Sequence, residues 1–284
     1  MVTVIQDVRE MQRASGQLRM TGKRLAVVPT MGYLHEGHLS LIRLAKQHAD
    51  LVITTIFVNP TQFGPGEDFE RYPRNLPQDT RLAAEAGTDY IFAPEATSMY
   101  PEGYRTYVNV EQFDRMLEGK SRPGHFRGVA TVVAKLFATT KPHVAVFGQK
   151  DAQQVVVIQQ MVRDLNFDIE IVVGPIIREA DGLAMSSRNA YLEPDQRKEA
   201  VVLYKALQLA QERIQVGQKD AARIIRDMND LITSRSSGKV DYISIANGRT
   251  LEELATCDKQ RPLQVSLAVR FGTSRLIDNI FITD

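Results

Sequence analysis

Two histidines three residues apart, His35 and His38, are the side chains whose type and spacing most directly predict chemistry. Gly37 directly precedes the second histidine, and the motif reads His35-Glu36-Gly37-His38. It stands between a short apolar run at residues 25–28 and a helical pattern of apolar residues from residue 39. A buried strand that delivers a loop onto a helix N-terminus binds phosphates in open α/β proteins, because the first-turn N–H groups lack an intrahelical partner. We therefore interpret the motif as a nucleotide site whose imidazoles donate hydrogen bonds to charge developing between the α- and β-phosphates.

The local sequence leaves two other interpretations of this motif open. Residues three apart share a helix face, so the pair also suits a metal ion whose third ligand is His48, His125, His143 or a carboxylate. The pair is equally compatible with a structural role on a loop. No GxGxxG motif follows a strand and no GxxxxGKS/T motif occurs, which excludes the common dinucleotide and P-loop sites.

A second candidate segment, Gly148-Gln149-Lys150-Asp151, follows a strand predicted at residues 143–147 and opens a helix. It repeats the strand–loop–helix geometry that binds phosphates. Lys150 offers a point charge for a phosphate. Asp151 suits either the N-cap of the helix, which is the favoured role, or contact with a Mg²⁺ ion.

A third candidate is Ser186-Ser187-Arg188, at the end of a polar loop that begins near residue 178. Paired hydroxyls beside an arginine suit phosphate oxygens, through neutral donors and a bidentate fork. A surface turn with a solvated charge is the competing interpretation. The place of the loop just after a predicted domain boundary favours function, because mobile phosphate clamps often lie at such junctions.

Three amides near strand ends, Asn59, Gln62 and Gln154, are candidates for binding an organic substrate. An amide in a pocket binds a hydroxyl and a carboxylate without neutralising the carboxylate, which keeps its nucleophilicity. Arg122 is a candidate lid residue over phosphates. A solvated surface position is the ordinary alternative for each of these side chains.

The elements that must position these residues alternate between strand and helix up to residue 174, which predicts right-handed βαβ units and a Rossmann-like parallel sheet. After Gly174-Pro175 come two amphipathic helices and three closely spaced strands, which predict a smaller α+β domain with an antiparallel sheet. We expect a first domain over residues 1–175, which binds the substrates, and a C-terminal lid domain over residues 176–284. The predicted helices are 7–20, 39–47, 78–86, 129–139, 151–165, 194–217 and 220–234, and the predicted strands are 25–28, 51–58, 90–93, 105–110, 143–147, 169–173, 240–245, 263–269 and 276–282.

Composition narrows the class of partner. The chain has 284 residues, a formal net charge of +1 and 43% hydrophobic residues, which is typical of a soluble globular protein. The charge balance argues against nucleic acid as the main partner. No apolar run reaches the about 20 residues of a membrane helix, and the N-terminus has no secretory signal pattern. Cys257 is the single cysteine, so we expect a cytoplasmic protein without an internal disulfide.

Five segments together resemble the pantothenate synthetases, the pantoate–β-alanine ligases, which share the HxGH loop with nucleotidylyltransferases and class I aminoacyl-tRNA synthetases. The segments occur in the same order as in the family and span almost the whole chain. They are PTMGYLHEGH at 29–38, FVNPTQFGPGEDFERYPR at 57–74, RPGHFRGV at 122–129, FGQKDAQQ at 147–154 and READGLAMSSRNAYL at 178–192.

The resemblance implies an AMP-forming acid–amino-acid ligase with the substrates pantoate, β-alanine and ATP, the last with Mg²⁺, and it suggests a homodimer. It implies that pantoyl adenylate and pyrophosphate form first and that β-alanine then releases pantothenate and AMP. Ser186-Ser187-Arg188 takes the place of the KMSKS loop of the class I synthetases. Two serines stand here in place of most of the lysine charge of that loop. By resemblance, His38 is the proton donor and Gln62 and Gln154 bind pantoate. The implied ATP contacts are Met31, Gly32, Tyr33, Leu34, His35, Glu36, Gly37, His38, Gly148, Gln149, Lys150, Asp151, Ile177, Met185, Ser186, Ser187 and Arg188.

Two rival functions belong to other classes. A nucleotidylyltransferase shares the HxGH motif but needs no amine as a third substrate, so AMP release that depends on β-alanine separates it from a ligase. A non-catalytic nucleotide sensor would bind ATP without exchanging pyrophosphate into it. An RNA-ligating synthetase is disfavoured by the charge balance and by the lack of an anticodon-binding extension.

Overall fold

The structure, a computed structural model, describes residues 2–258 and 260–283, and these fall into two compact units. The first unit contains Val157–Pro175 and the described residues up to Gly148. The second contains Gln149–Val156 and the described residues from Ile176 onward. Among the described helices, none combines the length and the apolar character needed to cross a membrane.

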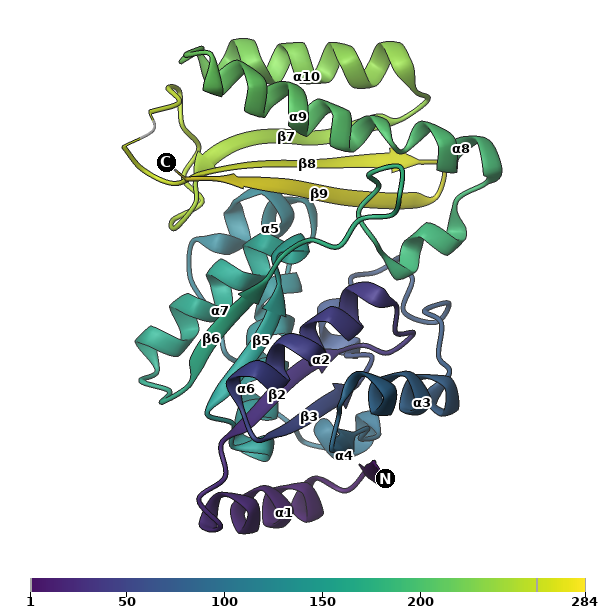
Figure 1. The fold of residues 1–284 in the computed structure, drawn as a ribbon, viewed down its shortest axis with the longest axis vertical. Coiled ribbons are helices and arrows are strands. Elements are labelled where there is room, and N and C mark those ends of the chain that lie inside the picture. The colour runs from purple at the N-terminus through teal and green to yellow at the C-terminus, as the bar shows by residue number, and fades with distance from the viewer. Residues whose placement is uncertain (1, 259, 284) are drawn as a thin grey trace. The chain divides into compact units, whose positions relative to one another are not determined.

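The first unit is built on a parallel six-stranded sheet with the strand order β1-β4-β3-β2-β5-β6 (Figure 1). The predicted Rossmann-like parallel sheet is therefore confirmed. The strand order reverses between β2 and β5, and ligands of open α/β sheets bind beyond the carboxyl ends of the strands at such a switch point. The strands are β1 (Thr3–Ile5), β2 (Leu25–Thr30), β3 (Leu51–Ile56), β4 (Tyr90–Phe92), β5 (Val144–Gly148) and β6 (Glu170–Gly174).

Helices cover both faces of this sheet. Apolar residues of α2 and α3 pack with alternate residues of β2, β3, β4 and β5, and α2 lies in front of β2 in Figure 1. The intervening strand residues, such as Val27 and Ile53, are fully buried on the other face. The helices up to β6 are α1 (Val8–Met20), α2 (Glu36–His48), α3 (Leu76–Ala86), α4 (Ala96–Met99), α5 (Leu117–Ser121), α6 (His125–Thr140) and α7 (Ala152–Asp164), with the 3₁₀ turns η1 (Pro60–Gln62), η2 (Phe113–Arg115) and η3 (Gln149–Asp151).

Two strand predictions differ from the structure. Strand β2 continues through Pro29 to Thr30, because Pro29 faces β5 at a point where β5 no longer pairs with β2 and no main-chain donor is needed. The strand predicted at residues 105–110 is absent. There the main-chain N–H of Val108 donates to the side chain of Thr131 on α6, at 2.9 Å, and so joins no ladder.

Several helices begin elsewhere than predicted. Helix α2 begins at Glu36 with His35 as its N-cap, so most of the HxGH motif forms the first helical turn and is not a loop. Helix α6 begins at His125, four residues before the predicted start. The helix predicted at 194–217 is divided into α8 and α9 at residues 200–201. Strand β1, helix α4 and helix α5 are short and were not predicted.

The second unit contains an antiparallel sheet with the strand order β7-β8-β9, as predicted. Helices α9 and α10 cover one face of this sheet (Figure 1), and their apolar residues form a core with alternate strand residues such as Val265, Leu267 and Val269. The elements are η4 (Ser187–Tyr191), α8 (Pro194–Glu199), α9 (Val202–Gln215), α10 (Ala221–Arg235), β7 (Lys239–Asn247), β8 (Leu263–Phe271) and β9 (Ser274–Ile282).

A close backbone contact fixes α6 against η1 in the first unit. A Cβ atom on Gly128 would lie 2.2 Å from the carbonyl oxygen of Thr61 and 2.7 Å from the Cα of Gln62. Both neighbours are main-chain atoms, so the contact cannot be relieved by a side-chain rotation. Only glycine allows this approach of α6 to η1.

We expect Gly128→Ala to lower the free energy of unfolding by about 1–3 kcal/mol, because the added methyl group forces η1 and α6 apart. Chemical denaturation measures the change. Gly64→Ala is the matched control, because its added Cβ meets only a side-chain atom of Glu67, at 3.9 Å. A Gly128→Ala variant as stable as the control would show that this approach carries no packing constraint.

Candidate functional site

A buried carboxylate on α3 shapes the turn between β2 and α2. Asp79 is 2% exposed, and its two oxygens accept the main-chain N–H groups of Tyr33 and Leu34 at 2.8 and 2.7 Å. Burial raises the pKa of Asp79, and the two main-chain donors act in the opposite direction. Both oxygens are used, so this side chain holds two successive peptide groups of the HxGH segment in place.

The backbone of this turn takes conformations that few residue types adopt. Gly32 has φ +85°, and a Cβ there would lie 2.9 Å from Asp79 Oδ2 and 3.1 Å from Ile56. Tyr33, next in sequence, has φ 50°. Left-handed backbone at a residue other than glycine or asparagine is uncommon and is retained where surrounding contacts determine it. Here the hydrogen bonds that Asp79 accepts from Tyr33 and Leu34 hold the backbone in this conformation.

Main-chain hydrogen bonds orient the two imidazoles of the motif. Nδ1 of His35 accepts the N–H of Gly37 at 3.2 Å, and Nδ1 of His38 accepts the N–H of His35 at 3.3 Å. The ring centroids lie 4.1 Å apart. A neutral imidazole that accepts at Nδ1 carries its proton on Nε2. Both rings therefore have an Nε2–H donor beside the N-terminus of α2, which is the group that a developing negative charge requires.

The predicted substrate amides Asn59 and Gln62 meet at η1. Asn59 is 1% exposed, and its Nδ2 donates to the Gln62 Oε1 at 3.1 Å and to the carbonyl of Gly128 at 3.2 Å. Its Oδ1 accepts the hydroxyl of Tyr100 at 2.8 Å, and burial raises the pKa of that hydroxyl to about 12. Gln62 Nε2 lies 3.2 Å from the sulfur of Met31. The structure thus brings Gln62 to the HxGH segment and makes Asn59 the residue that orients it.

Arg122, predicted as a lid residue, makes a clamp with Glu67 and His125. Its Nε and Nη2 donate to the two Glu67 oxygens at 2.7 Å each. Burial acts to raise the pKa of Glu67, but the hydrogen bonds and charge of Arg122 outweigh it, and the pKa lies below its usual value. Arg122 Nη2 also donates to the carbonyl of Gln62 at 3.3 Å. In this arrangement Arg122 holds the segment that carries Gln62.

His125 completes the clamp as a neutral ring. Its Nδ1 is 2.9 Å from the carbonyl oxygen of Gln62, and its Nε2 is 3.0 Å from Nη1 of Arg122. A carbonyl only accepts and a guanidinium only donates, so Nδ1 carries the proton and Nε2 is unprotonated. Burial, together with the positive charge of Arg122, lowers the pKa of His125 to about 4.

In the second unit, residues 177–185 form a hairpin that leads into the predicted serine loop. Met185 N–H donates to the carbonyl of Ile177 at 2.9 Å, and Gly182 has φ +95° at the turn. Ser186 is the N-cap of η4, with its Oγ accepting the N–H of Arg188 at 3.2 Å. Arg197 braces the turn through Glu179 and Asp181, at 2.6 and 2.7 Å.

The remaining predicted residues have less distinctive surroundings. Lys150 lies in η3 of the second unit with its Nζ 3.9 Å from Asp151 Oδ1, and Gln154 is half-buried on α7. Glu36 pairs with Arg43 on the outer side of α2. Across residues 2–258 and 260–283, no three His, Cys, Asp or Glu side chains gather in a group that could bind a metal ion.

Sequence reasoning missed several side chains that organise these segments. Asp79 and Tyr100 act through partners 45 and 39 residues away in the chain, so no local pattern marks them. Glu67 pairs with Arg122, 55 residues away, and its place inside the segment at 57–74 was a usable signal. His125 was considered only as a metal ligand, although its place inside the segment RPGHFRGV beside Arg122 was a usable signal. Asp278 and Asn279 of β9 carry no sequence signal of function.

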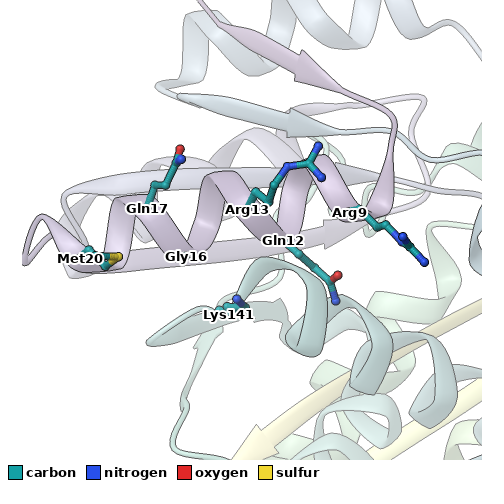
Figure 2. Close-up of a pocket in the computed structure, with 7 residues that line it drawn as sticks. All are labelled: Arg9, Gln12, Arg13, Gly16, Gln17, Met20 and Lys141. Carbon is teal, nitrogen blue, oxygen red and sulfur yellow. The ribbon is translucent and has the colours of Figure 1, made fainter.

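A shallow hollow of about 510 Å³ lies elsewhere on the first unit, along α1 (Figure 2). Arg9, Arg13 and Lys141 give it positive charge. Lys141 lies two residues before His143, whose main-chain N–H donates to the carbonyl of Leu25, the first residue of β2. The hollow is therefore near the amino ends of the central strands, whereas the HxGH motif follows the carboxyl end of β2. It contains none of the predicted site residues.

A parallel sheet whose central strand leads into a His-x-Gly-His helix start defines a Rossmann-like α/β protein of the HxGH type. A sequence model described as Pantoate-beta-alanine ligase matches residues 3–281. The chain belongs to this family, and it is a ligase that joins pantoate and β-alanine to form pantothenate. The resemblance seen in the sequence is therefore confirmed.

Similar proteins cover the whole chain. A pantothenate synthetase of Acetivibrio thermocellus is 53% identical over 279 residues, which are 98% of this chain and 99% of that protein. A crystal structure of the Thermus thermophilus pantothenate synthetase matches with a TM-score of 0.94, 44% identity and complete coverage of both chains. The Francisella tularensis pantoate-beta-alanine ligase, complexed with beta-gamma ATP and beta-alanine, matches with a TM-score of 0.80 and 34% identity, over 99% of this chain and 97% of that one.

We expect Asp79→Asn to lower the free energy of unfolding by about 1–3 kcal/mol, because the amide has one acceptor oxygen and leaves one buried N–H of the turn unsatisfied. Denaturation with urea measures this loss. Asp50→Asn is the control, since this exposed carboxylate accepts the N–H of Arg24 at 2.7 Å away from the turn. Equal stability of the two variants would contradict the role given to Asp79.

We expect the neutral state of His125 to make the protein less stable in acid. Its pKa is about 4 in the folded chain against 6.5 when unfolded, so the unfolded chain binds the extra proton first as the pH falls. Between pH 7 and pH 5 this one group removes about 2 kcal/mol of stability. The measurement compares the pH dependence of unfolding in the wild type and in His125→Asn, which cannot titrate. Parallel curves for the two proteins would show that His125 is not held neutral.

Proposed function

We propose that this ligase activates pantoate as an acyl adenylate. The pantoate carboxylate attacks the α-phosphorus of ATP, a new P–O bond forms, and the bond to the β-phosphate breaks to release pyrophosphate. The amine of β-alanine then attacks the acyl carbon, the C–N bond forms, and AMP leaves with the former carboxylate oxygen. The amine nitrogen gives up its proton to solvent.

The observation that carries this proposal is the pair of imidazoles at the N-terminus of α2. Each accepts a main-chain N–H at Nδ1 and so carries a proton on Nε2. Donors fixed before the reaction stabilise a transition state more effectively than donors that must reorganise. His35 and His38 are proposed to donate to the oxygens that gain charge when the α–β bond breaks.

Gln62 is proposed to bind pantoate. Asn59 sets the orientation of its side-chain amide, and His125 and Arg122 hold its main-chain carbonyl. An uncharged amide leaves the substrate carboxylate ionised, as its role as a nucleophile requires. Gln154 is proposed to bind the same substrate on the strength of the family resemblance alone.

Lys150, Ser186, Ser187 and Arg188 are proposed to neutralise phosphate charge. ATP is proposed to bring Mg²⁺ with it as part of the substrate. Magnesium is usually held by substrate phosphates with one or two carboxylates, so no three-ligand protein site is needed. Asp151 is the candidate carboxylate, since it is half exposed beside Lys150. A homodimer is a further expectation from the resemblance, and the single cysteine leads us to expect a cytoplasmic location.

Two measurements test the proposal as a whole. Pyrophosphate should exchange into ATP only when pantoate is present, and AMP should be released only when β-alanine is then added. Pyrophosphate exchange without AMP release on addition of β-alanine would favour a nucleotidylyltransferase, because that enzyme leaves AMP attached to its acceptor. ATP binding with no exchange under any condition would favour a nucleotide sensor.

We expect His38→Ala to slow adenylation by about 10²–10³-fold, because it removes one preorganised donor from the transition state. Rapid-quench measurement of the first turnover reports this step directly. His48→Ala is the matched control, because His48 lies in the last turn of the same helix. A His38→Ala rate within a few-fold of the control would remove His38 from the proposed chemistry.

A further inference from the structure

Two adjacent residues of β9, Asp278 and Asn279, are polar and yet almost completely buried, with exposures of 2% and 3%. Buried polar groups are stable only when their hydrogen bonds are satisfied. The partners of these two side chains lie in two segments that are far away in sequence, η3 and the hairpin at residues 177–185. η3 carries Lys150 and the hairpin leads directly into Ser186, and the proposed function assigns phosphate contacts to both residues.

Asn279 holds the main chain of η3. Its Nδ2 donates to the carbonyl oxygens of both Gln149 and Lys150, at 3.0 Å each. Its Oδ1 accepts Nε2 of Gln149 at 3.2 Å. Two donors on one nitrogen and an adjacent acceptor are available from an amide but not from a carboxylate or a hydroxyl. The residue type therefore fits this set of partners closely.

Asp278 holds the hairpin through Arg178. Its two oxygens accept Nη1 and Nη2 of Arg178 at 2.7 and 3.0 Å, in a bidentate pair. Arg178 also donates to the carbonyl of Gly182 at 3.1 Å, and its guanidinium lies 3.8 Å from the ring centre of Tyr204. The arginine is thus fixed on several sides, and with it the start of the hairpin that leads to Ser186.

The two sets of contacts are linked to each other. Arg178 Nη2 lies 3.4 Å from the carbonyl oxygen of Asn279, and the N–H of Asn279 donates to Asp278 Oδ1 at 2.8 Å. Burial raises the pKa of Asp278, while Arg178 and, from farther away, Lys150 act to lower it. The charge on Lys150 therefore acts on the same carboxylate that anchors the hairpin.

We propose that Asp278 and Asn279 are positioning residues for ATP binding, which fix the backbone of Lys150 and the hairpin before Ser186-Ser187-Arg188 to a single point of β9. Neither side chain is proposed to touch ATP. Asn279 acts through Lys150, and Asp278 acts through Arg178. The inference rests on the proposed function, because that function assigns phosphate contacts to Lys150 and to Ser186-Ser187-Arg188.

The direct test is the dissociation constant of ATP, measured calorimetrically on the full chain, for the wild type, Asn279→Ala and Asn279→Asp. Loss of the two main-chain hydrogen bonds should weaken ATP binding at least tenfold in both variants. Asn279→Asp should bind ATP more weakly than Asn279→Ala, because the carboxylate oxygen that replaces Nδ2 faces the carbonyl oxygens of Gln149 and Lys150. The KM for β-alanine should stay within twofold of the wild type, which separates a positioning role from a general loss of fold.

Gln264→Ala is the matched control. Gln264 is a buried amide of the same sheet, 2% exposed, and its Nε2 donates to Ser266 at 2.9 Å and not to η3. The Gln264→Ala variant should be less stable than the wild type and should bind ATP with an affinity within twofold of the wild type. Asn279 variants that bind ATP as tightly as the wild type, or a control that loses as much affinity as they do, would overturn the proposal.

A double-mutant cycle tests the route through Lys150. In a Lys150→Ala background, Asn279→Asp should weaken ATP binding no further, because the side chain that it positions has been removed. A second full tenfold loss would overturn that route. Where neither Asn279 variant folds, Asn279→Ser retains one donor and should give an intermediate loss of affinity, and unchanged affinity in that variant would equally overturn the proposal.

The same experiments distinguish this inference from the proposed function. A wild type that binds ATP but does not exchange pyrophosphate in the presence of pantoate would overturn adenylation and leave the binding comparison intact. If the wild type exchanges pyrophosphate and the Asn279 variants bind ATP as tightly as the wild type, adenylation is retained and the positioning role is removed.

Discussion

The two hydrogen bonds that Asp79 accepts from the turn between β2 and α2 are the constraint on which the rest of the HxGH site depends. They hold Tyr33 in a left-handed conformation and leave no room for a side chain at Gly32. The chain can then enter α2 at His35 with both imidazoles bonded to the first helical turn. Sheet, turn and helix together therefore place the two Nε2–H donors.

The same construction recurs in the other segments with proposed chemistry. A side chain from a distant element satisfies main-chain groups of the segment and so sets the position of a neighbouring functional side chain. His125 and Arg122 do this for Gln62, because both donate hydrogen bonds to its main-chain carbonyl oxygen. Asn279 does it for Lys150 in the second unit. Because main-chain groups are present whatever the local residue type, such support fixes the geometry of a segment without depending on the side chains that it carries.

Local patterns were sufficient to predict most strands and helices and the parallel and antiparallel sheets, and they singled out the segments to which chemistry is proposed. They failed where a long-range contact overrides the pattern. The β-like run at residues 105–110 bonds to Thr131 on α6 and not to a strand, and the start of α2 was obscured because Gly37 has a low helix propensity. The partners of Asp79 and Asn279 lie 45 and about 130 residues away, and no periodicity in one sequence encodes such pairs. Asn59 and Arg122 were candidates from the sequence, but their contacts with Gln62 could not be read from it, and Asp79 and Asn279 had no local signal at all.

The proposed attack of the pantoate carboxylate on the α-phosphorus of ATP is tested most directly by isotope transfer. Pantoate labelled with ¹⁸O in both carboxylate oxygens should pass one label to AMP, because the bridging oxygen of the acyl adenylate leaves with the phosphate. Mass spectrometry should find one ¹⁸O atom in AMP, one in the amide carbonyl of pantothenate and none in pyrophosphate. Unlabelled AMP from a complete turnover would contradict the account.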